Sequence, residues 1–342
     1  MGVPMGGAGF HPYKPLSPLH NLRGIALKLS QDFFLKNRLI VMRLARDLLV
    51  AELGSRIRTV DYYANQFDVS RGTIQKAMQF LVEQRCVTSD FRGHLGSYLT
   101  FKDDEKLWEY SGFGALSGAM PLPLAPLTAG LATGICDCMK AEDVAFNCVF
   151  VQGSRVRVKG LRQGKYDFII ASRLTEQAIS NEYDDVQKVL DLPNCIYAGR
   201  YILLFANPSK SEIEDGMIIA VDPTSIDQMY LTELVCAGKD VTVHESTYLD
   251  TLYKVKSGEA DVTVSRADAV ADFKLVRQDT HVKKLVLPGC TDAEIDLFGT
   301  AVVLAMNDNY GLAALLQKIL SPSVVAQTQK QVMAGLRISG YY

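Results

Sequence analysis

Residues 70–82, SRGTIQKAMQFLV, combine hydroxyl, amide and basic side chains with a regular apolar pattern. The apolar members recur with the spacing of one helix face: Ile74, Ala77, Met78, Leu81 and Val82. The opposite face begins with short polar and basic groups: Arg71, Thr73, Gln75 and Lys76. Such groups in the first turns of a helix can read base edges and hold phosphates in the major groove of DNA. An ordinary amphipathic scaffold helix shows a similar pattern, so both interpretations stay open for this stretch alone.

The residues around this stretch predict the elements that would present it. Ser70 is suited to cap a helix over 71–84, and Thr59 is suited to cap a preceding helix over about 60–67. A glycine-punctuated turn, FRGHLG, then joins two short strand-like runs at 86–89 and 97–101. Helix, tight corner, helix and hairpin form the layout of a winged helix-turn-helix, which we expect over residues 22–104.

The stretch SRGTIQKAMQFL also resembles the recognition-helix motif of GntR-type winged-helix repressors, and this resemblance covers residues 39–101. It implies that Arg71 and Thr73 contact DNA, while Arg92 and His94 at the tip of the wing lie along the minor groove. The sequence departs from the family pattern at Asp61, where the family commonly has an Arg. The predicted DNA-binding residues are Thr59, Ser70, Arg71, Thr73, Gln75, Lys76, Arg92 and His94.

Beyond Tyr110 the pattern changes to alternating strand-like and helical segments, which predicts parallel sheets flanked by helices. Two stretches, RQGKYDFIIASR at 162–173 and KSGEADVTVSR at 256–266, share a signature. Each has a Gly suited to end a helix, an Asp three residues later, and an apolar strand that ends in Ser-Arg. We interpret residues 105–342 as two similarly wound lobes. Lobe 1 would take about 110–206 with 298–342, and lobe 2 about 207–297.

In such a fold, helix N-termini point free amides toward the carboxyl ends of the parallel strands, where a small anion would suit the cleft. The predicted ligand-binding residues at these corners are Ser117, Gln152, Gly153, Ser154, Ser172, Arg173, Asp222, Thr224, Ser225 and Ser265. Arg173 or Arg266 could hold a carboxylate or phosphate through two hydrogen bonds. Each residue also has a structural alternative, as a helix cap or a surface ion pair, so the prediction depends on the convergence of several corners.

Two segments carry a resemblance in this half. GKYDFIIAS and GMIIAVDPTSIDQM resemble steps of the type 2 periplasmic-binding-protein fold, as used by cytoplasmic regulators to sense small molecules. The joint architecture resembles the YhfZ family of regulators over about 25–342. The implied fold class is α/β, with an N-terminal winged helix-turn-helix and a C-terminal two-lobed α/β domain.

The composition, 48% apolar and 22% charged, is that of a globular chain. Lys and Arg outnumber Asp and Glu by 14 to 10 over residues 23–106, but are outnumbered 28 to 21 from residue 107 onward, so the first part tolerates a polyanion better. The first 20 residues hold four Gly and four Pro, and residues 1–21 are expected to be a flexible leader. With no apolar run of about 18 residues and no signal-peptide pattern, we expect a cytoplasmic protein with no membrane partner.

The sequence contains none of the common motifs of hydrolases, metalloproteases, P-loop proteins or dinucleotide-binding enzymes. His244 with Cys236 or Asp261 could be a catalytic set, but no pairing of a nucleophile with a base is legible. The seven cysteines are expected to be free thiols, although Cys136 and Cys138 could contribute to a metal site. We therefore predict no catalytic residues, no cofactor and no metal. The alternative is an enzyme of the same fold that acts on a small anionic metabolite.

These observations predict a ligand-responsive transcription regulator that binds double-stranded DNA and a small anionic effector. Two half-sites about 34 Å apart on DNA would match a two-fold axis in the protein, so we expect a homodimer. The helical pattern over 25–53 is either part of the dimer contact or part of the core, and the sequence does not decide between these.

Overall fold

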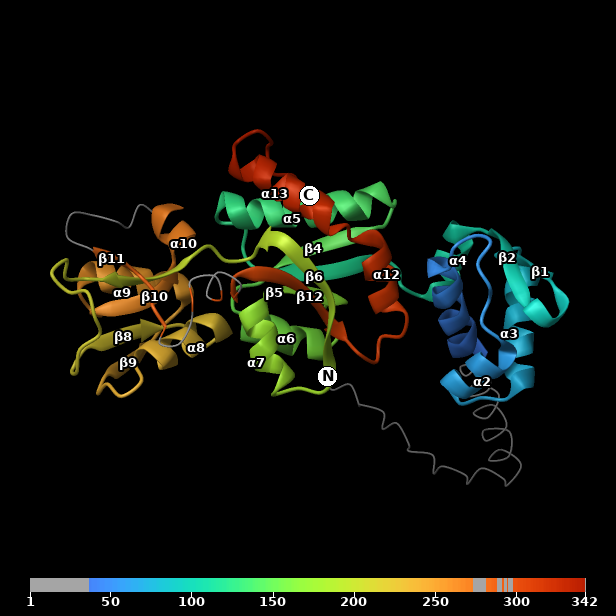
Figure 1. Cartoon of the computed structure of the whole chain (residues 1–342), viewed down its shortest axis with the longest axis horizontal. Helices are drawn as coiled ribbons and strands as arrows, with labels where there is room; N and C mark the ends of the chain where they lie inside the picture. Colours follow the sequence, from blue (N-terminus) through green and yellow to red (C-terminus); the bar gives the residue numbers. More distant parts are fainter. Residues whose placement is uncertain (1–36, 273–280, 288–290, 292–293, 295–297, 342) are drawn as a thin grey trace, which may run out of the picture. The chain divides into compact units, whose positions relative to one another are not determined.

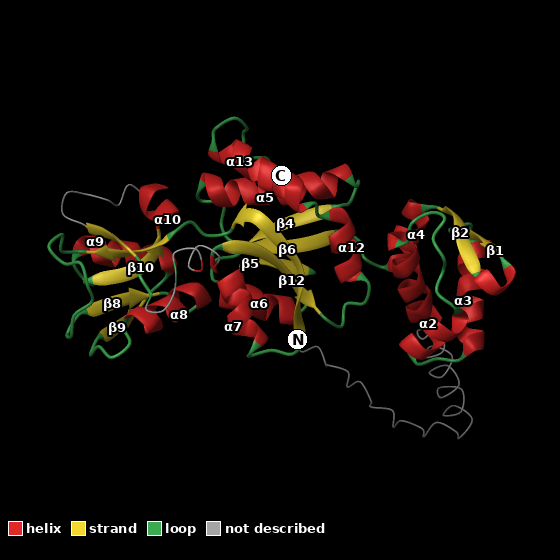
Figure 2. Cartoon of the chain, viewed as in Figure 1, coloured by secondary structure: helices red, strands yellow, loops and turns green. Residues whose placement is uncertain are grey.

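The computed structural model describes residues 37–272, 281–287, 291, 294 and 298–341 (Figure 1). The chain divides into two compact units, one that ends at Ser111 and one that begins at Gly112. Figure 2 shows helices and one hairpin in the first unit, and helices around two sheets in the second. The predicted leader at 1–21 and the first part of the helical pattern at 25–36 lie outside the described residues. No helix in the described part of the chain is long and apolar enough to cross a membrane.

The first unit is a helical bundle with a wing. A helix over 37–50 packs Leu44 and Leu48 into a core that also holds Ile74, Leu81 and Leu99. The elements that follow are α2 (Val60–Phe67), α3 (Arg71–Glu83), β1 (Val87–Phe91), the 3-10 turn η1 (Gly93–Leu95), β2 (Ser97–Lys102) and α4 (Asp104–Ser111). β1 and β2 form an antiparallel hairpin. The fold class predicted for this part, a helix-turn-helix followed by a hairpin, is the one observed.

Two local expectations in the first unit need correction. The charge run KDDEK at 102–106 predicts a solvated linker, but α4 begins within it, where Asp103 accepts a hydrogen bond from the Lys106 amide and Leu107 is fully buried. The charged side chains occupy the remaining face of that helix. The apolar stripe of α3 is also narrower than expected, since Val82 is 42% exposed.

The first lobe of the second unit contains a five-stranded sheet in the order β4-β3-β5-β12-β6. Its strands are β3 (Leu116–Met120), β4 (Phe146–Phe150), β5 (Phe168–Ser172), β6 (Val186–Ile196) and β12 (Thr300–Met306). β3, β4 and β5 are parallel, as the alternating pattern predicted, whereas β12 is antiparallel to both of its neighbours. The helices are α5 (Pro126–Ala141), α6 (Ser154–Arg162), α7 (Arg173–Ser180), α12 (Leu312–Ile319) and α13 (Pro322–Met333). In Figure 1, α5 and α13 cover one face of the sheet, and α6 and α7 cover the other.

The second lobe repeats this strand order as β9-β8-β10-β7-β11. Its strands are β7 (Tyr201–Phe205), β8 (Ile218–Val221), β9 (Thr242–Glu245), β10 (Val262–Arg266) and β11 (His281–Lys284). Its helices include α8 (Ile226–Val235), α9 (Tyr248–Ser257) and α10 (Ala267–Asp272). In each sheet the fourth strand, β12 in the first lobe and β7 in the second, is the first strand after the chain crosses from the other lobe. β7 already pairs with β10, so the first crossing lies between Ile196 and Tyr201, earlier than the boundary expected near residue 207.

The repeated signature has a structural role in both lobes. Gly164 and Gly258 follow the ends of α6 and α9 with φ of +69° and +81°, a region that favours glycine. The carboxylate of Asp167 accepts from the Ser117 amide at 2.7 Å, and Asp261 accepts from the Ile218 amide at the same distance. Each Asp therefore pins the start of the neighbouring parallel strand.

Close packing of α5 against α13 is part of the core of the first lobe. A Cβ at Gly134 would lie 2.8 Å from the Cα of Val325, and one at Gly130 would lie 2.9 Å from the Cα of Gln329. Because the atoms in the way belong to the backbone, these neighbours cannot rotate away. Glycine is therefore required by the approach of the two helices.

We predict that Gly134→Ala lowers the free energy of unfolding by about 1–3 kcal/mol, because overpacking outweighs the gain in helix propensity of about 1 kcal/mol. Urea denaturation followed by circular dichroism would measure the change. Gly72→Ala is the matched control, since this glycine also lies in a helix but has only the Ser70 hydroxyl within 4 Å, at 3.8 Å. Equal or greater stability of the Gly134→Ala variant would contradict the packing argument.

Candidate functional site

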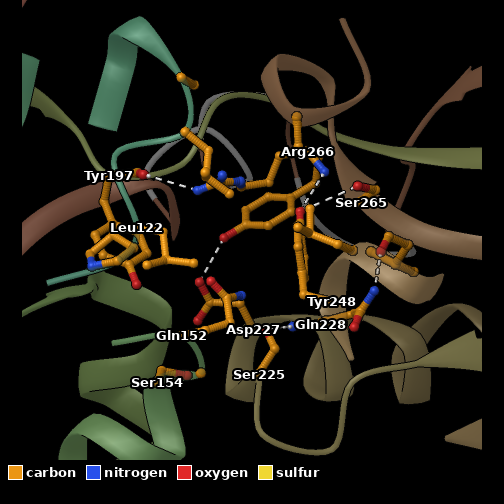
Figure 3. Close-up of a pocket in the computed structure, with 18 of the residues that line it drawn as sticks. Leu122, Gln152, Ser154, Tyr197, Ser225, Asp227, Gln228, Tyr248, Ser265 and Arg266 are labelled. Atoms are coloured by element: carbon orange, nitrogen blue, oxygen red, sulfur yellow. Dashed lines mark hydrogen bonds between the residues drawn. The ribbon is translucent and has the colours of Figure 1, made fainter. Parts of the chain in front are cut away.

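A pocket lies between the two lobes, where β3, β4, β8 and β10 end (Figure 3). Its enclosed volume is about 60 Å³, which is less than the roughly 300 Å³ of a typical site for a drug-sized molecule. In this conformation the pocket therefore suits a very small ligand or a few water molecules. Polar and charged groups that line it are Gln152, Ser154, Arg157, Tyr197, Tyr201, Ser225, Asp227, Gln228, Tyr248, Ser265 and Arg266.

Arg157 enters the pocket from the first turn of α6 and is only 1% exposed. Its Nη1 donates to the carbonyl oxygen of Val151 at 2.7 Å, and its Nη2 donates to the hydroxyl of Tyr197. Within the described part of the chain, its buried Nε has no hydrogen-bond partner. A buried guanidinium with one unused donor can bind an acceptor on a ligand.

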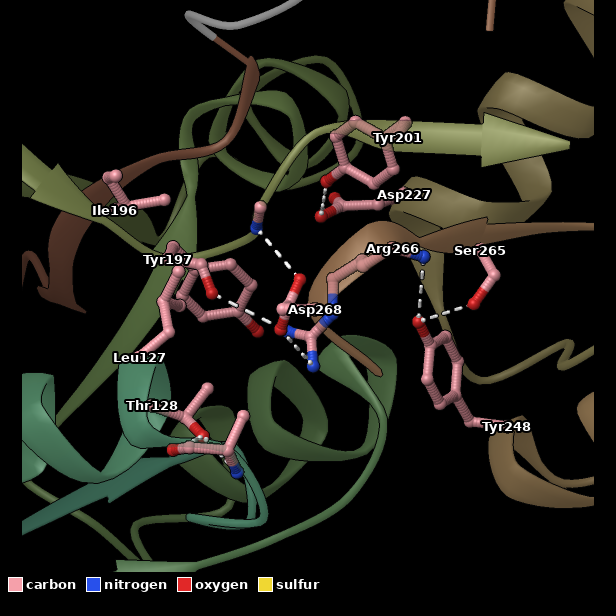
Figure 4. A network of polar contacts seen from close by, with 12 residues as sticks. Leu127, Thr128, Ile196, Tyr197, Tyr201, Asp227, Tyr248, Ser265, Arg266 and Asp268 are labelled. Carbon is pink, nitrogen blue, oxygen red and sulfur yellow. Dashed lines mark hydrogen bonds and ion pairs between the residues drawn. The ribbon is translucent and has the colours of Figure 1, made fainter. Parts of the chain in front are cut away.

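Arg266 reaches the pocket from the end of β10 in the other lobe (Figure 4). One Nη lies 3.4 Å from the carbonyl oxygen of Tyr197, and the other lies 3.4 Å from a carboxylate oxygen of Asp268. Burial alone would lower the pKa of Arg266, but the interactions with Tyr248 and Asp268 outweigh it and the pKa is raised. Its buried Nε also lacks a hydrogen-bond partner among the described residues. The pocket thus holds two guanidinium groups, one from each lobe.

The buried carboxylate of Asp227 joins the lobes at the floor of this pocket. Oδ1 accepts from the hydroxyls of Ser172 and Thr175, both at 2.7 Å, and Oδ2 accepts from the hydroxyl of Tyr201 at 2.8 Å. Ser172 and Thr175 belong to lobe 1, whereas Asp227 lies in the first turn of α8 in lobe 2. Burial and the Asp227 charge raise the pKa of Tyr201 well above its ordinary value, so this phenol stays protonated and donates.

A second set of contacts brings the N-termini of α6 and α8 together. The amide of Ile226 donates to Ser154 Oγ at 2.9 Å, and the amide of Arg155 donates to the carbonyl oxygen of Thr224 at 2.9 Å. Gly153 has φ of +83°, and a Cβ at this position would collide with the Thr224 side chain. A glycine is therefore required for the two lobes to approach this closely.

Five of the predicted ligand-binding residues line the pocket: Gln152, Gly153, Ser154, Ser225 and Ser265. They come from both lobes, and all follow or end parallel strands. The expectation that the corners of the two lobes converge is consistent with this placement, while ligand binding by these residues stays a prediction.

The other five lie elsewhere: Ser117, Ser172, Arg173, Asp222 and Thr224. The run FGALS at 113–117 predicts a strand that ends at Ser117, but β3 begins at Leu116, after Gly112 and Gly114 with positive φ, so Ser117 lies near its start. Ser172 is fully buried beneath Asp227, and Arg173 pairs with Asp191 at 2.8 Å. The carboxylate of buried Asp222 accepts from the amide and the hydroxyl of Thr224, so both residues shape the corner itself.

The sequence interpretation missed several residues that line the pocket. Arg157 lies within a basic helical stretch that resembles a solvated face, so no local signal marks it as buried. Tyr197 and Tyr201 flank the crossing between lobes, and Tyr248 follows β9. Asp227 lies two residues after the predicted corner at Ser225. Because Ser225 caps α8, Asp227 falls in the first turn of that helix, and this position was the signal that could have indicated it.

The predicted DNA-contacting face of α3 is exposed to solvent. Thr59 and Ser70 cap α2 and α3 by accepting from the amides of Tyr62 and Thr73, at 3.1 and 3.2 Å. Gln75 and Lys76 are exposed, while Thr73 is half-buried. Arg71 is also exposed and forms an ion pair with Asp61 at 2.9 Å.

The wing carries the other two predicted contacts. Arg92 pairs with Asp90 at 3.1 Å, and its guanidinium lies 4.5 Å from the centre of the Tyr98 ring. His94 is exposed in the 3-10 turn at the tip. All eight predicted DNA-binding residues thus lie in the first unit, on the capped helices and the wing.

No metal site is apparent in the part of the chain that the structure describes. It contains no group of three or more His, Cys, Asp or Glu that could hold a metal ion. Asp261, considered earlier beside His244, instead pins the start of β8. Cys136 and Cys138 are free thiols, as are the other cysteines described, whereas Cys290 lies outside the described residues.

Comparison with known proteins identifies both parts of the chain. A family model described as the YhfZ C-terminal domain matches residues 103–341, and one described as a helix-turn-helix domain matches residues 52–99. The uncharacterized protein YhfZ of Escherichia coli (strain K12) is 28% identical over 316 residues, which are 92% of this chain and 100% of that protein.

The crystal structure of YhfZ from Shigella flexneri superposes with a TM-score of 0.57 at 22% identity, over 69% of this chain and 97% of that chain. The periplasmic VFT2 domain of BvgS from Bordetella pertussis gives a TM-score of 0.48 at 12% identity, over 66% of this chain and 96% of that domain. The likeness to the Shigella flexneri structure concerns the fold.

We predict that Asp227→Ala lowers the free energy of unfolding of the second unit by about 3–5 kcal/mol, because it leaves three buried hydroxyls without their charged acceptor. Thermal unfolding of the full chain would measure this. Asp250→Ala provides a control, since Asp250 is exposed and, among the described residues, its carboxylate accepts only from the Ser246 hydroxyl. If the two variants are equally stable, Asp227 does not join the lobes as described.

Proposed function

Because the chain belongs to the YhfZ family and also carries a helix-turn-helix domain, we propose that it is a ligand-responsive transcription regulator that acts in the cytoplasm. The two domains together support a DNA-binding regulator with a ligand-binding domain, and in this proposal the chain is not an enzyme. In this proposal the helix-turn-helix unit binds operator DNA, and the pocket between the lobes binds a small anionic effector.

The observation that carries the effector assignment is the pair of arginines in the pocket, of which Arg157 is buried and Arg266 is partly buried. Arg157 and Arg266 approach the pocket from opposite lobes, and each has an Nε–H with no partner in the described residues. The N-termini of α6 and α8 add partial positive charge, and Ser225, which has a hydroxyl group, also lines the pocket. The carboxylate of Asp227 already accepts three hydrogen bonds, so it offers little to an incoming cation. A carboxylate or phosphate is the ligand chemistry that these groups suit best.

The DNA-binding assignment is supported by the exposed polar face of α3. Arg71, Gln75 and Lys76 project from the first two turns of a capped helix, which is how recognition helices present groups to the major groove. Residues 23–106 also carry an excess of positive charge, unlike the rest of the chain. We further propose that Thr73, Arg92 and His94 contribute to the same surface.

Regulation requires that the effector distinguish between two states of the protein. We propose a homodimer on two half-sites, in which closure of the lobes changes how the two reading units are presented to DNA. An effector can shift this equilibrium only by its difference in affinity for the two arrangements. Since the pocket draws groups from both lobes, a ligand that bridges Arg157 and Arg266 would favour closure.

We expect at least one small dicarboxylate, phosphate ester or amino acid in a thermal-shift screen to stabilise the full chain. At 100 times its Kd, one bound ligand adds about 2.7 kcal/mol. Arg157→Lys and Arg266→Lys keep the charge but lose the planar fork, so each should weaken binding of that ligand by about tenfold. Arg155→Lys is the control, because Arg155 is exposed and pairs with Glu182. Exclusive stabilisation by neutral ligands, or undiminished binding in both variants, would refute the anionic effector.

We expect the full chain to bind duplex DNA with an affinity that falls as salt rises. Arg71→Gln should cost about 1–3 kcal/mol on the preferred sequence and reduce discrimination between sequences. Lys76→Gln should weaken binding to all sequences and lower the salt slope by about one. Fluorescence anisotropy would measure both effects. Lys159→Gln, an exposed lysine of the second unit, serves as the control. Absence of duplex binding at low salt would end the DNA-binding proposal.

A further inference from the structure

The first unit contains a basic groove that the predicted DNA-binding residues do not explain. Arg56, Ile57, Arg58, Thr59 and Tyr62 line a surface groove of about 380 Å³, which we call the basic groove. Both arginines are exposed. The guanidinium of Arg58 lies over the Tyr62 ring, 5.0 Å from its centre, so the aromatic ring restricts the orientation of the charge.

The arginines of the basic groove differ from the predicted DNA contacts in how their charge is balanced. Arg71 and Arg92 are each neutralised by a neighbouring carboxylate, Asp61 and Asp90 respectively. Within the described residues, no carboxylate forms an ion pair with Arg56 or Arg58. Their charge is therefore available to an external anion, whereas the charge of Arg71 and Arg92 is shared with an internal partner.

The basic groove lies between the wing and the helix N-termini. The backbone of Arg56 forms an isolated antiparallel β-bridge with Tyr98 of β2. The Arg56 guanidinium also lies close to Gly96, since a Cβ at Gly96 would be 2.9 Å from Arg56 Nε. At the other end, Thr59 caps α2, and Asp61 in the first turn of α2 pairs with Arg71 at the start of α3. The segment from Arg56 to Thr59 thus connects the two parts of the unit that are predicted to contact DNA.

We propose that the basic groove binds backbone phosphates of the duplex that α3 reads, with Arg56 and Arg58 as the charged contacts. This inference rests on the proposed DNA binding. A guanidinium can give two parallel hydrogen bonds to phosphate oxygens, and the hydroxyl of Tyr62, whose side chain is 41% exposed, can donate a further one. The Thr59 hydroxyl accepts from the Tyr62 amide, which leaves its own hydrogen for a phosphate.

Backbone contact is favoured over base reading because neither arginine lies on the recognition helix. Arg56 is part of the extended segment beside the wing, and Arg58 is held over an aromatic ring, so neither extends from the face of α3 that would enter a groove. Contacts of this kind set the position of a protein on DNA and carry no sequence information directly. The groove should therefore contribute equally to specific and non-specific binding.

The test measures binding of the full chain to duplexes of preferred and scrambled sequence between 50 and 200 mM salt, with the variants Arg56→Gln and Arg58→Gln. Each neutralised phosphate contributes about 0.9 to the slope of log affinity against log salt. We expect each variant to lower the slope by about one and to weaken binding up to roughly tenfold near 0.1 M salt, by the same factor for both sequences. Arg38→Gln, an exposed arginine on the helix over 37–50, is the matched control and should leave the slope unchanged.

In a second experiment, thermal shift measures the binding of inorganic phosphate alone to the full chain. We expect phosphate to bind much more weakly than duplex, because a free phosphate lacks the neighbouring contacts. Unchanged slopes in both variants, beside a wild type that binds DNA, would overturn the inference, as would a loss confined to one sequence. A saturating phosphate shift that both variants abolish without any effect on duplex binding would assign the groove to free phosphate instead. If the wild type itself binds no duplex, the proposed function has failed first.

Discussion

The arrangement of the pocket depends on one buried charge. Asp227 is 7% exposed, and a carboxylate at such a site needs several donors to offset its lost hydration. The donors come from both lobes: Ser172 and Thr175 at the start of α7, and Tyr201 on β7. The Ser172 hydroxyl forms two hydrogen bonds. It donates to Asp227, and its Oγ accepts from the Thr175 amide, which caps the helix that carries Thr175. The lobes must approach to within hydrogen-bond distance to satisfy this charge, and that approach places Arg157 and Arg266 at the same cavity.

A consequence of this arrangement is that lobe closure and ligand recognition are separable. Asp227, Ser154 and Thr224 hold the lobes together through contacts between protein groups alone. The two guanidinium groups retain donors that no described protein group accepts, so a ligand adds interactions without replacing those that close the lobes. In the proposed mechanism, such a protein would visit the closed state without a ligand, and a ligand would then increase the population of that state. A cavity of about 60 Å³ holds only a few atoms, so the proposed binding of a larger effector would require the lobes to open in part.

Sequence patterns were informative where a local rule fixed the structure. The repeated Gly and Asp signature predicted equivalent strands in two lobes, because a helix end and a buried strand are each determined by a few adjacent residues. The caps at Thr59 and Ser70 were predictable for the same reason. Patterns failed where a residue's environment is supplied from far along the chain. Arg157 donates to the hydroxyl of Tyr197, which lies 40 residues later in the chain. Ser117 was expected at the carboxyl end of a strand but lies near the start of β3, after two glycines with positive φ, which hydropathy does not reveal.

The first unit divides its positive charges into two kinds, and this division has a physical rationale. An arginine paired with a fixed carboxylate loses part of its attraction for DNA but gains a defined orientation, which base reading needs because hydrogen bonds to base edges are directional. Asp61 and Asp90 can play this part for Arg71 and Arg92. An arginine without a carboxylate partner keeps its full charge, and this suits a phosphate, which accepts hydrogen bonds from many directions. The acidic residue at position 61 is thus compatible with DNA binding, provided that nearby cations with no carboxylate partner among the described residues, such as Arg56 and Arg58, supply the attraction that it removes.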